Sequence, residues 1–224
     1  MIEDKSIFNE VQNNISMMCR DDCIGADLAA SVSVAIEHKM RSVCVSPDNV
    51  VEVWPWLEKT NIKIISRFYV DEPITDDFMS DFSGRVSAAF HNGANGAIIF
   101  MSMHDLQKFI AEISSVRTDL FFNKTFNLGL DISEIGVFDW DGLFRLLHFI
   151  RADSLVLTFE KDTGDKSDFV GRVFAMLNAS RGDWTGTVNF VLGQNAIRID
   201  QVYRLIQQVK PETLSKTEFF IDND

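Results

Sequence analysis

Two lysines of this chain stand where a side-chain amine could react with a carbonyl group. Lys161 lies in the polar stretch EKDTGDKS that follows a short apolar run, and Lys124 lies within the stretch LFFNKTFN. An amine forms an imine with a carbonyl only when a dry pocket or a neighbouring cation keeps it unprotonated. Because Glu160 and Asp162 flank Lys161, we expect a solvated ammonium there, with imine formation as the alternative.

The orientation of Lys124 depends on the strand predicted for residues 120–127, because side chains alternate between the two faces of a strand. Lys124 is in phase with two phenylalanines, whereas Asn123 and Thr125 share the opposite face. If the polar face points inward, it forms a hydrogen-bonding pocket for a neutral polar ligand, and Lys124 extends outward between helices. If Lys124 points inward, it is a buried amine and a second candidate for imine formation. We favour the first arrangement.

Other side chains that could bind a ligand or a metal ion are few. Arg67, near the end of the strand predicted for residues 62–69, could bind a carboxylate or a phosphate, although pairing with a surface acid is its more ordinary role. The three cysteines, Cys19, Cys23 and Cys44, lack paired C-x-x-C spacing and have no histidine near them in sequence. They predict buried thiols, with neither a disulfide framework nor a metal site.

The composition predicts a cytoplasmic protein with one domain spanning residues 1–224. A core of adequate size is available, because 46% of the 224 residues are hydrophobic, and no linker-like stretch interrupts the chain. The net charge of −12 repels phosphate backbones and anionic membranes, so neither nucleic acid nor a membrane is an expected partner. The N-terminal residues do not resemble an export signal, and no apolar run is long enough to span a membrane.

Strand and helix patterns alternate along the whole chain. Strands this apolar are buried on both faces, which indicates a parallel sheet covered by helices. Eight of them favour a compact (β/α)₈ TIM barrel with an N-terminal helix at residues 3–13 and no final helix, and an open doubly wound sheet is the alternative. Ser46 and Ser102 are predicted to cap helices. The predicted strands cover residues 15–19, 42–45, 62–69, 96–101, 120–127, 154–159, 185–192 and 217–221.

Four of these segments resemble, in order and spacing, strands of the deoxyribose-phosphate aldolase family of Schiff-base TIM barrels. RSVCVSPDNVVEVWPWL at residues 41–57 is similar to the family's second strand, A-V-C-V-x-P, and HNGANGAIIF at 91–100 is similar to its fourth. RADSLVLTF at 151–159 and GTVNFVLGQNAIR at 186–198 resemble its sixth and seventh strands. The resemblance implies the TIM barrel fold and, in the family, a lysine-based lyase reaction.

The residues that carry the family's chemistry are replaced in this chain. The resemblance implies a Schiff-base lysine on strand six, a second lysine on strand seven and a proton-shuttling aspartate on strand four. Carried over without gaps, these positions hold Val156, Asn189 and Ile98. Valine and isoleucine can neither form an imine nor move a proton, so the family mechanism cannot operate at these positions.

The phosphate site of such barrels is also weakened. It is built from glycine-rich turns after strands seven and eight, whose N–H groups point at the anion. Here the turn after strand seven retains Gly193 alone, and strand eight leads into Asp222-Asn223-Asp224, whose carboxylates would repel a phosphate. A phosphorylated sugar is therefore a poor candidate ligand.

Three functional hypotheses follow. The first is a diverged aldolase-like barrel without aldolase activity, with a binding, regulatory or interaction role and no cofactor. It would bind a small polar metabolite at the barrel mouth through Arg67, Asn123, Thr125 and Asn189. The alternative is a class I aldolase, a carbon–carbon lyase that forms its Schiff base through Lys161 or Lys124. The third is a structural subunit, in a homo-oligomer or with a protein partner, because a missing last helix would expose apolar surface beside strand eight.

Overall fold

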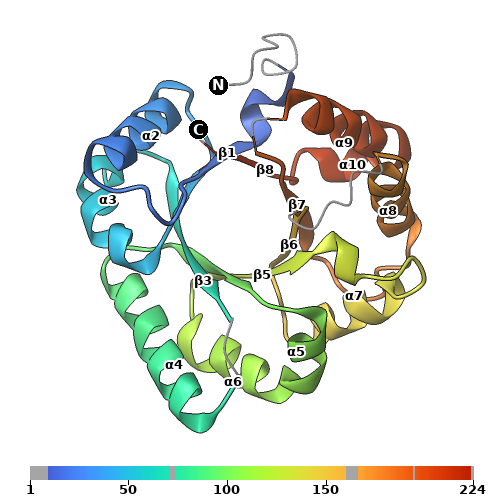
Figure 1. Ribbon diagram of the computed structural model, residues 1–224, viewed down its shortest axis with the longest axis horizontal. Helices are drawn as coiled ribbons and strands as arrows, with labels where there is room; N and C mark the ends of the chain where they lie inside the picture. The colour runs from blue at the N-terminus through green and yellow to red at the C-terminus, as the bar shows by residue number, and fades with distance from the viewer. Residues whose placement is uncertain (1–9, 71–73, 160–165, 194, 223–224) are drawn as a thin grey trace.

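The computed structural model describes residues 10–70, 74–159, 166–193 and 195–222. In these residues eight parallel strands form a closed barrel in sequence order, and the helices form a ring around it (Figure 1). Ile15 and Met17 of the first strand pair in parallel with Phe219 and Ile221 of the last. This pairing closes the sheet, so the TIM barrel is confirmed and the open doubly wound sheet is wrong. The strands are β1 (Ile15–Met18), β2 (Ser42–Val45), β3 (Lys63–Tyr69), β4 (Gly96–Phe100), β5 (Thr125–Asp131), β6 (Ser154–Thr158), β7 (Thr187–Val191) and β8 (Phe219–Ile221).

The helices that cover the barrel lie between its strands in sequence. Short 3₁₀ helices occupy Gln12–Asn14, Pro47–Asn49 and Ile132–Glu134. The N-terminal helix expected at residues 3–13 falls mainly outside the described residues, as does the region after Asp222. The α-helices are α2 (Gly25–Glu37), α3 (Val50–Leu57), α4 (Asp76–His91), α5 (Met103–Lys108), α6 (Ile110–Leu120), α7 (Trp140–Phe149), α8 (Lys166–Asn178), α9 (Ala196–Val209) and α10 (Pro211–Leu214).

Of the two serines predicted to cap helices, Ser102 does so and Ser46 does not. The Ser102 hydroxyl accepts a hydrogen bond from the Asp105 N–H at 3.0 Å and so caps α5, as expected. Ser46 precedes the 3₁₀ helix that starts at Pro47, but its side chain makes no capping hydrogen bond. Pro47 itself provides the helical start, because its fixed φ suits the first position and it has no N–H to satisfy.

The fifth strand begins at Thr125, and the prediction that it begins at residue 120 is wrong. Leu120 is the last residue of α6, and the chain then turns through Phe121 and Asn123. Asn123 has φ of +58°, a left-handed conformation that asparagine tolerates better than most residues. The first part of the predicted strand, before Thr125, is therefore not a strand and includes a turn. The observed strand, β5, continues to Asp131.

Alternation along the strands divides the buried side chains into two groups. One set packs outward against the helices and forms the larger core, with Leu128, Leu155 and Phe190 among its fully buried members. The other set points into the barrel and forms a smaller cluster, which we call the inner apolar layer. Its members are Met18, Cys44, Ile65, Ile98, Phe100, Val156 and Phe220.

None of the described helices is long and apolar enough to cross a membrane.

Candidate functional site

The three positions that correspond to the resembled family's catalytic residues all face the barrel interior. Val156 and Ile98 belong to the inner apolar layer and have no exposed surface. Asn189 is the register partner of Val156 on the neighbouring strand and is also buried. The strand alignment therefore assigns these residues to the correct face, and the groups present there are two hydrocarbon side chains and one amide.

Polar cavities lie at both ends of the barrel, on either side of the inner apolar layer. The N-terminal cavity contacts the layer through Ile65, Val156 and Phe220. The C-terminal cavity contacts it through Phe100, and no lining residue is common to both cavities. Since the carboxyl ends of the strands form the active-site face of TIM barrels, the C-terminal cavity is the candidate functional site.

The C-terminal cavity has a volume of about 220 Å³ and an aromatic wall. Tyr69 and Phe100, at the ends of neighbouring strands, stack with ring centroids 5.2 Å apart and planes inclined by 20°. The hydroxyl-bearing Thr158 and Ser102 and the carboxylates of Asp131 and Glu134 complete the polar lining. Among the described residues that line this cavity, none is a lysine.

The two carboxylates of the C-terminal cavity are held by backbone N–H groups. Asp131 Oδ1 accepts a hydrogen bond from the Ser133 N–H at 2.8 Å, at the start of the 3₁₀ helix Ile132–Glu134. Glu134 Oε2 accepts one from the Met103 N–H at 2.9 Å, in the first turn of α5. These bonds fix the positions of the two carboxylates in the wall of the cavity.

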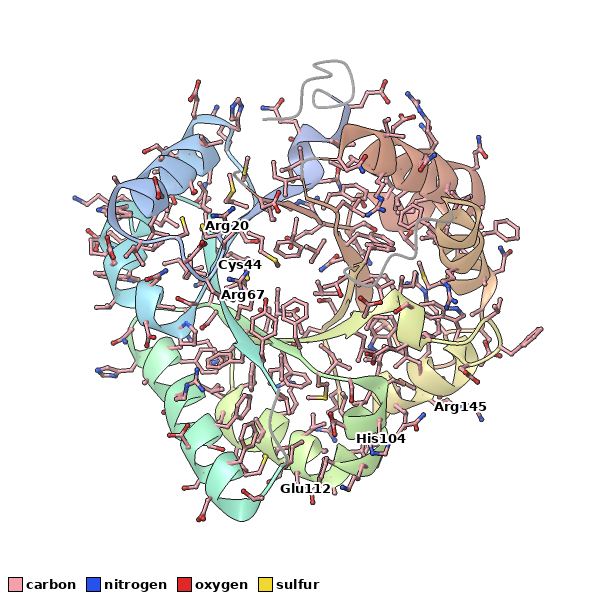
Figure 2. The ribbon with its side chains drawn as sticks, viewed as in Figure 1. Arg20, Cys44, Arg67, His104, Glu112 and Arg145 are labelled. Carbon is pink, nitrogen blue, oxygen red and sulfur yellow. The ribbon has the colours of Figure 1, made fainter. Side chains whose placement is uncertain are left out.

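Arg67 reaches the same end of the barrel, but its charge is already paired. Its side chain is 4% exposed, and Nη2 donates to Asp21 Oδ1 at 2.5 Å, in the loop after β1. The guanidinium also lies over the Tyr69 ring, 5.7 Å from its centroid. Figure 2 shows Arg67 and Cys44 within the ring of strands. The ordinary role, pairing with an acid, is therefore the one that the structure shows.

Burial keeps the thiols of the barrel unreactive. Burial is the largest cause that raises the pKa of Cys44, and of Cys19, to about 12. Both thiols are buried, and Cys23 is partly buried. A thiol with so high a pKa is a poor nucleophile and a poor metal ligand at neutral pH. Among the described residues, no group of three or more His, Cys, Asp or Glu side chains is placed to hold a metal ion.

The turn after β7 carries a carboxylate beside its glycine. Gly193 has φ of +58°, and a Cβ built on it would lie 3.3 Å from Asp222 Oδ1 at the end of β8. In TIM barrels that bind phosphate, the N–H groups after strands seven and eight point at the anion. Here Asp222 brings negative charge to that place.

The predicted ligand-binding residues lie at opposite ends of the barrel. Arg67 is at the C-terminal end, whereas Thr125 and Asn189 line the N-terminal cavity. Asn123 is exposed in the turn before β5, so the prediction that it lines the barrel with Thr125 is wrong. The start of β5 at Thr125 explains the difference, because inward alternation begins only there.

Of the two lysines predicted as candidates for imine formation, the structure describes only Lys124. Lys124 immediately precedes β5, and its Nζ donates to the Ala94 carbonyl at 2.5 Å and lies 5.4 Å from the Phe90 ring centroid. It extends outward, as favoured, and the inward arrangement is wrong. Lys161 lies outside the described residues.

Sequence reasoning missed Asp131, Glu134 and Thr158 as lining residues of the C-terminal cavity. The signal was present, because Gly129-Leu130-Asp131 continues the inward alternation of Thr125 and Asn127. A predicted strand that ended four residues later would have placed Asp131 at the carboxyl end.

Comparison with known proteins supports the fold. No protein-family model matches the sequence, and no curated protein matches it. Among solved structures, one from Toxoplasma gondii ME49 assigned as a deoxyribose-phosphate aldolase has a TM-score of 0.72 at 16% identity, covering 97% of this chain and 91% of that one. The deoxyribose phosphate aldolase of Aeropyrum pernix, described as tetrameric, has a TM-score of 0.68 at 12% identity, covering 96% and 86%. The chain thus has the TIM barrel fold of these aldolases.

Proposed function

We propose that this protein is a ligand-binding barrel that has the aldolase fold without aldolase chemistry, and that serves a binding or regulatory role. Its C-terminal cavity takes a small polar molecule that carries no phosphate. The observation that carries the proposal is Val156, a fully buried hydrocarbon side chain at the position that corresponds to the Schiff-base lysine.

The lack of an amine among the described residues of the inner apolar layer supports this proposal. Ile98 packs with Val156 in the inner apolar layer, so the position of the family's aspartate also holds hydrocarbon. An imine mechanism needs an amine and a proton carrier within reach of one carbonyl. Neither group is present among the side chains of the inner apolar layer.

The charge at the C-terminal face argues against sugar phosphates. Asp222 lies beside Gly193 where a phosphate would bind, and Asp131 and Glu134 line the cavity. The only cation buried there among the described residues, Arg67, is paired with Asp21. A neutral or cationic ligand with a flat apolar part fits the Tyr69–Phe100 wall beside these acidic side chains.

The alternative function is a class I aldolase that forms its imine through Lys161. Lys161 follows β6 in sequence, three positions after its last residue, Thr158. Lys124 does not serve in this role, because its amine contacts Ala94 and Phe90 outside the barrel.

Trapping of an imine tests both functions. The protein is incubated with acetaldehyde or with deoxyribose 5-phosphate, reduced with borohydride, and analysed by intact mass. We expect no stoichiometric adduct and no cleavage of the sugar phosphate. An adduct that maps to Lys161 and disappears in Lys161→Met would overturn the proposal and establish the aldolase. Lys124→Met is the matched control.

Self-association is a second property that we propose. Phe138, in the loop before α7, is 98% exposed, and Phe122, in the turn after α6, is 83% exposed. Exposed aromatic side chains are enriched at protein interfaces, and the Aeropyrum pernix aldolase is described as tetrameric. Light scattering over a concentration series tests this, and a monomer at all concentrations would remove it.

A further inference from the structure

The N-terminal end of the barrel holds a second polar cavity, remote from the candidate functional site. Its volume is about 160 Å³, which is the volume of about five water molecules. It lies at the face where TIM barrels ordinarily carry residues for stability. The polar residues that line it are Ser42, Lys63, Thr125, Asn127, Asp153, Ser154, Thr187, Asn189, Lys216 and Glu218.

Some of the side chains that line this cavity are hydrogen-bonded to neighbouring strands of the barrel. The Asn127 amide donates to the Ala97 carbonyl at 2.9 Å and accepts from the Ser154 hydroxyl at 2.7 Å. Asp153 Oδ2 accepts from the Phe126 N–H at 2.8 Å. These side chains hold three neighbouring strands in register, and we assign them a structural role.

A different part of the lining has no partner within the described residues. The Ser42 hydroxyl is buried, with the residue 1% exposed, and it has no hydrogen-bond partner. The Asn189 oxygen accepts from the Glu218 N–H at 2.9 Å, which leaves the Asn189 amide nitrogen as a donor. The Glu218 carboxylate is partly exposed and makes no hydrogen bond or salt bridge in the described part of the chain. A native structure rarely leaves a buried hydroxyl such as that of Ser42 unsatisfied.

The charges around the cavity are unusual for so acidic a protein. Lys63 and Lys216 line it and form no salt bridge with any described residue. Arg41 lies nearby and donates to the backbone carbonyls of Ser215 at 2.6 Å and Thr217 at 3.4 Å. Arg41 and Lys63 act on the Glu218 carboxyl and lower its pKa, although burial raises it more. The neighbour of Glu218 in the lining, Asp153, accepts from the Phe126 N–H and lies 3.6 Å from Arg117. The local excess of positive charge favours an anion.

We propose that the N-terminal cavity binds a small hydroxycarboxylate. Its carboxylate lies between the Lys63 and Lys216 ammonium groups and receives a hydrogen bond from the Asn189 amide. Its hydroxyl group donates to Glu218 and accepts from Ser42. The volume limits the ligand to a molecule of the size of glycolate, lactate or glycerate.

Binding of three related probes tests the site on the whole protein. Glycerate has both groups, acetate lacks the hydroxyl, and glycerol lacks the charge. Calorimetry and the thermal midpoint should show binding of glycerate, with acetate and glycerol weaker by about ten-fold or more, because each loses one set of hydrogen bonds. Absence of glycerate binding, or equal binding of acetate, would overturn the proposal.

Variants locate the bound molecule. The double variant Lys63→Met, Lys216→Met should weaken glycerate binding by about ten-fold or more, and Ser42→Ala by a few-fold. Both lysines are exposed, so these changes leave the fold intact, which circular dichroism verifies. Asp131→Asn, in the C-terminal cavity, should not change glycerate binding. If Asp131→Asn abolished binding and the lysine variant did not, the ligand would lie at the other end of the barrel, and the proposal would be wrong.

Discussion

Val156 and Asn189 are register partners on β6 and β7, and both side chains face the interior of the barrel. Asn189 is anchored by its hydrogen bond from the Glu218 N–H, while Val156 packs in the inner apolar layer. The pair therefore places a hydrocarbon side chain and an amide at the two positions where the resembled aldolase family has lysines. This geometry decides what restoring a lysine would do.

Val156→Lys should destabilise the protein without creating aldolase activity. The members of the inner apolar layer include no acid, so burial of an ammonium among them should cost about 3 kcal/mol or more of unfolding free energy. Val156→Thr keeps the shape and buries one hydroxyl, which should cost about 1–2 kcal/mol. Denaturant unfolding of both variants measures the difference. Equal losses would show that water reaches the centre of the barrel.

Glu218→Gln should make stability less sensitive to pH. Burial raises the pKa of the Glu218 carboxyl, and Arg41 and Lys63 lower it less than burial raises it. The folded state thus holds the proton to a higher pH than the unfolded chain, and stability falls as pH rises through the raised pKa. The variant should be more stable than the wild type above that pKa, and the difference should vanish below about pH 4.5, the ordinary value.

Denaturant midpoints measured from pH 4 to pH 8 check this prediction. Glu58→Gln, at an exposed position at the end of α3, is the control and should change neither the midpoint nor its pH dependence. The prediction would be contradicted if the wild-type protein became more stable than Glu218→Gln as the pH rises through this range. The neighbouring cations would then lower the pKa of the Glu218 carboxyl by more than burial raises it.

How far the sequence predicts the fold is shown by β5 and β8. Apolar runs bounded by helix patterns place seven strands within a few residues, since burial on both faces leaves a clear signal. The segment 120–127 is misplaced because a polar turn with Asn123 in the left-handed region has the same alternation as a strand end. Closure depends on pairing between Ile15 and Phe219, a long-range contact that no local pattern contains.

The candidate site was predicted less well than the fold, for a related reason. The interior positions Val156 and Asn189 follow from the resemblance to the aldolase family, and Arg67 was correctly placed near a strand end. Asp131 was missed, because it enters the site only when β5 ends four residues later than expected. The N-terminal cavity combines side chains from strands far apart in sequence, so only the closed barrel brings them together.

Asp21→Ala should reveal how strongly the loop after β1 depends on Arg67. The guanidinium is buried while the Asp21 side chain is 62% exposed, so solvent partly replaces the lost partner. We expect a loss of about 1–2 kcal/mol of unfolding free energy, more than for an ordinary surface pair. In the background of Arg67→Met, the same change should cost about 0.5 kcal/mol or less. An additive double variant would mean that the pair contributes nothing.

Gly193→Ala and Gly142→Ala should have opposite effects on stability. At Gly193, φ of +58° disfavours any side chain, and a Cβ would lie 3.3 Å from Asp222 Oδ1, so the change should cost about 1–2 kcal/mol. At Gly142, within α7, a Cβ meets no atom within 4 Å, and alanine should stabilise the helix by up to about 1 kcal/mol. Thermal unfolding of both variants measures the contrast. If Gly193→Ala were neutral, the turn after β7 would not be held in the left-handed conformation, and the placement of Asp222 against it would lose its support.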